Sequence, residues 1–162
     1  MAHIMNFFYS DDENDSMYFV KGHLYIEFAL NNIIEKAYAE PSALKRLSGS
    51  FANKIMLLRA IGRLSPEMES YLKEFNRMRN KLAHEIDYEL NYDEIIEIAR
   101  KAHNSEVEFV DVNMYNALDG NRGHYEVHDV IEELISGSFY SLFKLNEDLY
   151  PNEEYSKYTK CW

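Results

Sequence analysis

Apolar residues recur at three- and four-residue steps in five stretches of the chain, and polar residues fill the positions between them. This spacing places the apolar side chains on one face of an α-helix, so each stretch predicts an amphipathic helix. The five predicted helices cover about residues 16–39, 50–61, 65–84, 92–103 and 126–149. In the first helix the apolar surface includes Val20, Leu24 and Phe28, and in the second Phe51 and Ile61 are expected to point inward.

Capping signals support the boundaries of these helices. Ser50, Ser65 and Asn91 each stand directly before a predicted helix, where a short polar side chain can accept a hydrogen bond from a free backbone N–H. Pro66 suits the first helical position, and Gly62 suits a left-handed turn after the second helix. The last helix is expected to pack back on the first.

The stretch from residue 105 to 125 lacks a clear period. Val107, Phe109 and Val110 favour an extended segment, and the cluster from Asp119 to Gly123 is typical of a turn. We therefore predict a long loop here, with a short strand as an option. The fold class that follows is all-α, a bundle of about five helices.

Size and composition fit a single domain. The chain has 162 residues, of which 46% are hydrophobic, and this is enough for one core. We predict a mobile N-terminal arm over residues 1–15, whose first four residues resemble a vector remnant, a helical domain over 16–150, and a tail over 151–162. Cys161 is the only cysteine, which excludes an intrachain disulfide and favours a reducing compartment. No apolar run is long enough to span a membrane, so we expect a cytoplasmic protein.

Charge is distributed unevenly along the chain. The net charge is −11, yet residues 41–84 contain nine Lys or Arg against three acids. A cationic segment in an acidic protein could bind the phosphate backbone of a nucleic acid at one place. The alternative is that the basic helices face acidic elements of the same fold.

The segment Arg79-Asn80-Lys81-Leu82-Ala83-His84 carries the candidate chemistry. RNA is cut when a base takes the proton of a 2′-hydroxyl and its oxygen attacks the adjacent phosphorus, and a cation stabilises the negative charge that develops. An imidazole titrates near neutrality and a guanidinium matches phosphate oxygens with a planar fork. The nearby Lys73, Arg77 and Lys81 are the candidate RNA-binding residues.

An arginine with a polar neighbour, four intervening residues and a histidine resembles the motif of the HEPN superfamily. The order Gly22-His23-Leu24, then Phe51 to Ile55, then Phe75 to His84 is similar to the mannitol operon repressor family within that superfamily. This resemblance implies a helical homodimer in which His84 is the acid or base, Arg79 clamps phosphate and Asn80 orients one of them. It extends no further than about Tyr88.

Helical geometry sets a condition on this site. At about 100° per residue, Asn80 and His84 share a face, whereas Arg79 and His84 lie about 140° apart. Either the helix bends near Ala83, or a two-fold partner supplies the second residue. Otherwise Asn80 and His84 are hydrogen-bonded polar groups at a helix edge and Arg79 pairs with an acid.

Two functions are open at this point. One is a metal-independent endoribonuclease of toxin or defence type, with RNA as substrate and an antitoxin as protein partner. The other is a non-catalytic regulator that acts through protein contacts. No cofactor is predicted. His124 and His128 have a spacing that can hold a metal on a helix, but at a loop-to-helix junction such residues are usually surface groups, so no metal site is predicted.

Overall fold

The computed structural model describes residues 14–44, 46–85 and 87–150, and within these ranges it contains helices and no strand. Nearly all of the predicted N-terminal arm and the whole predicted tail lie outside the described residues. The prediction of an all-α bundle is confirmed. There are six α-helices and two short 3₁₀ helices in the described part: α2 (Asp15–Ala37), η1 (Pro41–Leu44), α3 (Phe51–Ala60), α4 (Pro66–His84), α5 (Tyr92–His103), α6 (Val112–Leu118), α7 (Val127–Lys144) and η2 (Glu147–Leu149).

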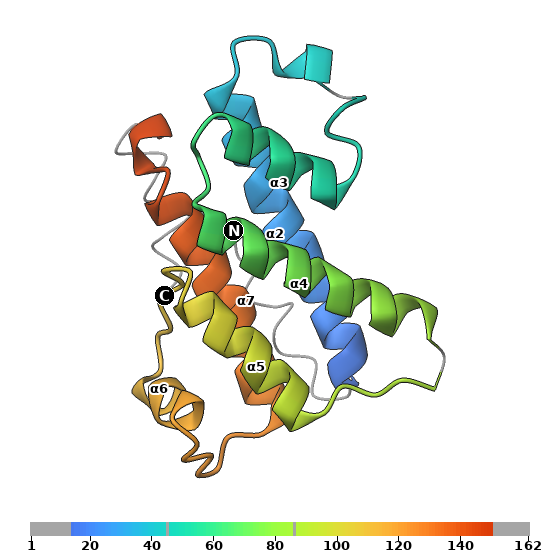
Figure 1. Cartoon of the computed structure of the whole chain (residues 1–162), viewed down its shortest axis with the longest axis vertical. Coiled ribbons are helices and arrows are strands. Elements are labelled where there is room, and N and C mark those ends of the chain that lie inside the picture. Colours follow the sequence, from blue (N-terminus) through green and yellow to red (C-terminus); the bar gives the residue numbers. More distant parts are fainter. Residues whose placement is uncertain (1–13, 45, 86, 151–162) are drawn as a thin grey trace, which may run out of the picture.

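Helices α2 and α7, the first and last α-helices of the described residues, pack against each other, as predicted (Figure 1). Gly22 of α2 makes this approach close, because a Cβ atom built on it would lie 1.9 Å from Cδ1 of Ile135 in α7. Any larger residue at position 22 would require Ile135 to move. The pairing therefore depends on a glycine in the interior of a helix, where glycine is otherwise unfavourable.

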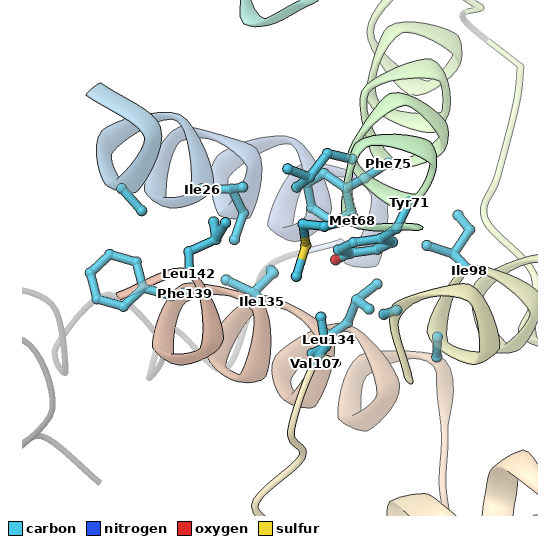
Figure 2. Close-up of a cluster of buried hydrophobic side chains, with 14 of the residues drawn as sticks. Ile26, Met68, Tyr71, Phe75, Ile98, Val107, Leu134, Ile135, Phe139 and Leu142 are labelled. Atoms are coloured by element: carbon cyan, nitrogen blue, oxygen red, sulfur yellow. The ribbon is translucent and has the colours of Figure 1, made fainter. Parts of the chain in front are cut away.

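The remaining helices complete one core around this pair. Helices α3 and α4 pack on α2, and α5 packs on α4 and α7. Figure 2 shows Ile26 of α2, Phe75 of α4 and Leu142 of α7 pointing into the same apolar cluster. Tyr71 is fully buried there, and its hydroxyl lies 2.5 Å from Oγ of Ser138. A buried hydroxyl needs such a partner, and this contact links α4 to α7 across the core.

The predicted caps are confirmed. The side chains of Ser50, Ser65 and Asn91 accept hydrogen bonds from the backbone N–H groups three residues later, at 3.2, 3.1 and 3.0 Å. Pro66 opens α4, and Gly62 has a φ of +74° after α3. The start of α4, and with it the position of the candidate motif along the helix, follows from this local chemistry.

The prediction of a long loop with an optional strand over residues 105–125 is wrong for residues 112–118, which form a helix, while the described residues of this stretch on either side are irregular and contain no strand. Helix α6 lies within this stretch, begins after the cap Asp111 and buries Met114, Ala117 and Leu118 against α5. Valines favour strands, but Val110 and Val112 have no strand partner and are 65% and 70% exposed. The seven residues of α6 are too few for a hydrophobic period to stand out in the sequence.

Two other details of the prediction are corrected. The last helix ends at Lys144, not near residue 149, and η2 follows it. Leu24, Phe28 and Ile61 are 56%, 45% and 41% exposed, so the buried stripe of α2 runs instead through Phe19, His23 and Ile26. Two polar residues, His23 and Lys54, point inward where the pattern predicted apolar side chains. Each pairs with a polar residue of another helix.

Candidate functional site

The motif occupies the last two turns of α4, which is helical through His84. The backbone N–H of Glu85 donates to the carbonyl oxygen of Lys81 at 2.9 Å and closes the final turn. A bend near Ala83, the first of the two ways to bring Arg79 and His84 together, is therefore absent. The two side chains project from α4 in directions about 140° apart.

Arg79 is half-buried, and its guanidinium is held within the motif. Its Nη1 donates to Oδ1 of Asn80 at 3.1 Å, while its Nε is buried and has no hydrogen-bond partner within the described ranges. Those ranges contain no carboxylate within 4.0 Å of the guanidinium either. The expectation that Arg79 pairs with an acid, which belonged to the non-catalytic interpretation, is not met by any described acid.

His84 is exposed at the end of the helix. No hydrogen bond joins it to Arg79 or Asn80 in the part of the chain that the structure describes. Within the described part of one protomer, Arg79 and His84 are therefore not in hydrogen-bonding contact.

The three cations predicted to bind RNA are all engaged within the protomer. Lys73 lies 2.6 Å from Glu69, Arg77 lies 2.6 Å from Glu74, and Lys81 lies 3.3 Å from Glu94. The hydrogen bond from Arg77 lowers the pKa of the Glu74 carboxyl. These pairs are solvent-exposed and weak, so a polyanion could compete for the cations, but they reduce the net charge that such a ligand would meet.

Other cations of residues 41–84 also contact acids elsewhere in the fold. Lys54 pairs with Glu27 of α2 at 2.5 Å, and Arg63 lies 2.7 Å from Asp148. The uneven charge along the sequence is therefore largely balanced in space. This agrees with the interpretation in which basic helices face acidic elements, and it leaves Arg79 as the cation of α4 without a described carboxylate.

A buried polar contact that the sequence pattern did not reveal lies beside the motif. His23 of α2 is only 3% exposed, and its Nε2 lies 3.0 Å from Oδ1 of Asn76 in α4. Its ring packs against Phe51 of α3 with 4.1 Å between centroids. The available signal was a histidine within the stripe Phe19, His23, Ile26, Leu30, since a polar residue in an apolar stripe needs a specific partner.

The environment of His23 lowers the pKa of its imidazole. Burial lowers the pKa of His23, and the charge of Arg79 lowers this pKa further, against the opposing effect of the hydrogen bond that His23 donates to Asn76. A guanidinium near a buried neutral imidazole is an arrangement found at functional sites as well as in structural polar clusters.

The segment after the motif is anchored to α5. The hydroxyl of Tyr88 donates to the carboxylate of Glu94, and Nζ of Lys81 lies 3.5 Å from the centroid of the Tyr88 ring. The hydrogen bond from Tyr88 lowers the pKa of Glu94. These contacts tie the segment after His84 to α5.

His124 and His128, the two histidines considered for a metal site, have different surroundings. Nδ1 of His128 lies 3.2 Å from Oδ1 of Asp15, and its ring stacks on Tyr18 at 4.4 Å. His124 is exposed in the preceding turn. Across the described ranges, no group of three or more His, Cys, Asp or Glu side chains is arranged to hold a metal ion.

Neither a protein-family model nor a curated protein nor a solved structure matches this chain. The likeness to HEPN proteins therefore rests on the quoted residues alone. Among the helices that the structure describes, none is both long and apolar enough to cross a membrane.

Proposed function

We propose that the chain is an endoribonuclease that acts as a homodimer and needs no metal ion. The observation that carries this proposal is the state of Arg79: among the four cations of α4 it is the one without a described carboxylate, and its guanidinium is oriented by Asn80. A guanidinium that is positioned and not neutralised is suited to holding a phosphate. His84, exposed one and a half turns later, is suited to proton transfer.

The reaction follows from these two groups. The imidazole of His84 takes the proton of a ribose 2′-hydroxyl, and the oxygen forms a bond to the adjacent phosphorus. The bond from phosphorus to the 5′-oxygen breaks, and that oxygen leaves with a proton from an acid. The guanidinium of Arg79 stabilises the additional negative charge on the phosphoryl oxygens. The products carry 2′,3′-cyclic phosphate and 5′-hydroxyl ends.

The divergence of Arg79 and His84 on α4 is the reason to include a dimer. A two-fold interface that contains the end of α4 would face the arginine of one protomer with the histidine of its partner. The resemblance to HEPN proteins supports the same arrangement. RNA as a ligand and toxin or defence as the biological setting come from that resemblance.

The experiment compares cleavage of a varied RNA panel by the wild type and by His84→Ala, in buffer with EDTA. We expect the variant to lose a factor of about 10²–10⁴ in rate, because general acid–base catalysis contributes that much. His103→Ala is the matched control, since it removes an exposed histidine from the last turn of α5. An intact RNA panel with the wild type would contradict the proposal.

A second candidate is a non-catalytic regulator that resembles the mannitol operon repressor family and acts through protein contacts. The intramolecular pairing of Lys73, Arg77 and Lys81, together with the net charge of −11, favours it. Under this hypothesis the wild type leaves every RNA intact. His84→Ala then has no catalytic consequence to measure.

A further inference from the structure

The buried imidazole of His23 has one ring nitrogen with a partner and one without. Oδ1 of Asn76 can only accept, so the Nε2 atom 3.0 Å away carries the proton. In a neutral ring the other nitrogen, Nδ1, is then an acceptor. This atom is buried and no described group donates to it.

Arg79 offers the complementary group on the facing helix. It follows Asn76 by three residues and so lies on the same side of α4, one turn further along. Its Nε–H is a donor, is buried, and has no acceptor among the described residues. The two helices therefore carry an unpartnered acceptor on α2 and an unpartnered donor on α4, and the charge of Arg79 is close enough to act on the His23 ring.

We propose that His23 is a positioning residue for Arg79. Asn76 holds its imidazole as the neutral tautomer whose Nδ1 is an acceptor, one bridging water links this atom to Nε–H of Arg79, and the link aims the rest of the guanidinium at a phosphate group. The pair needs a neutral ring, since a protonated His23 would present a second donor to a donor. Glu27 and Lys54 are the other charged groups that act on this ring. This inference rests on the proposed function only for the identity of the ligand.

The first test reads Arg79 without any ligand, by the exchange of its side-chain Nε–H with solvent in ¹⁵N NMR spectra. The variant is His23→Gln, because a glutamine amide reaches the position of Nε2 and can still donate to Asn76 but has no acceptor where Nδ1 was. We expect exchange at Arg79 to become about tenfold faster, as loss of one hydrogen bond to a charged group would cause. The Nε–H of Arg77, which donates to Glu74, is the control in the same spectrum and should not change.

A second variant covers the case in which His23→Gln fails to fold. Asn76→Ala removes the acceptor that fixes the tautomer of His23, so Nδ1 is no longer held as an acceptor and exchange at Arg79 should also become faster. Unchanged exchange in whichever of the two variants folds overturns the proposal.

The second test measures how well the site holds phosphate, with a fluorescein-labelled single-stranded oligodeoxyribonucleotide as the probe. DNA has no 2′-hydroxyl, so binding is separate from cleavage. We expect His23→Gln to weaken binding about tenfold, and the double variant with Arg79→Ala to bind no worse than Arg79→Ala alone. Faster Nε–H exchange with no RNA cleavage by the wild type would support the role of His23 and reject the nuclease, whereas tight probe binding by His23→Gln would reject the role of His23.

Discussion

The contact between α2, α3 and the middle of α4 differs sharply from the end of α4, although the residues of both belong to the segments that resemble HEPN proteins. In the middle, His23 bonds to Asn76 and Lys54 pairs with Glu27, so the polar groups serve helix packing. At the end, the hydrogen-bond partner of Arg79 among the described residues is Asn80, and His84 is exposed. A family-like pattern can thus contain one part whose polar groups pair within the bundle and another whose polar groups are exposed or lack a described partner.

The largest expected effect tests whether Arg79 of one protomer acts together with His84 of its partner. Arg79→Ala and His84→Ala should each be inactive, but a mixture of the two should regain about a quarter of wild-type cleavage, since half of the randomly formed dimers contain one intact pair of the two. Gel-based cleavage after incubation of the mixture measures this recovery. If the mixture stays as inactive as its components, each site lies within one protomer.

The second prediction removes the ion pair between Lys54 of α3 and Glu27 of α2. Lys54→Met keeps the apolar stem of a buried side chain but leaves the carboxylate of Glu27, itself only partly exposed, without its partner. We expect a loss of about 1–3 kcal/mol, or roughly 2–10 °C in the melting temperature. Adding Glu27→Leu removes the unpaired charge and should recover most of that loss. A single variant that melts like the wild type would mean that Glu27 is solvated well enough to need no partner.

The contrast between the two regions also separates what the sequence predicted from what it did not. Caps such as Ser65 and Asn91 act over three residues, so the boundaries of α4 and α5 could be predicted from local chemistry. The inward position of Lys54 could not, because it depends on Glu27, which is distant in sequence and adjacent only after α2 and α3 have packed. The same holds for His23 and Asn76.

The placement of the candidate residues on α4 was predicted in part, and their role stays a prediction. Arg79, Asn80 and His84 were identified from residue types and spacing, and helical geometry anticipated that Arg79 and His84 diverge. Lys73 and Arg77 pair with acids in the preceding turn of α4, Glu69 and Glu74. Helical spacing alone could have indicated these two pairs. The partner of Lys81 lies on α5 and required the tertiary fold.

The third prediction concerns pH. The pKa of His23 is lowered in the folded protein, so below the unfolded value of about 6.5 the unfolded chain binds more protons than the folded one. The stability that His23 contributes is therefore present above pH 6.5 and is lost as the pH falls towards its folded pKa, at no more than about 1.4 kcal/mol per pH unit. Urea unfolding at pH 7.5 and 5.5 measures the loss. His23→Gln should lose less stability than the wild type over this interval.

The smallest expected effect belongs to the exposed ion pairs. Arg77→Ala removes the contact with Glu74 at the surface of α4 and should change stability by no more than about 0.5 kcal/mol. If RNA displaces Glu74 from Arg77, the same variant should weaken RNA binding and reduce its dependence on salt. Binding titrations at two salt concentrations decide between an RNA contact and a surface pair.

The pairing of α2 with α7 has a consequence for synthesis on the ribosome. The chain emerges from its N-terminus, so the face of α2 around Gly22 is made first and its partner Ile135 more than a hundred residues later. At ordinary translation rates this corresponds to an interval of about 5–20 s, during which the apolar face of α2 lacks α7 although α3 and α4 are already made. A nascent chain that stalls before residue 127 would expose that face to chaperones and proteases. The packing of α7 on α2 is therefore the step that completes the core.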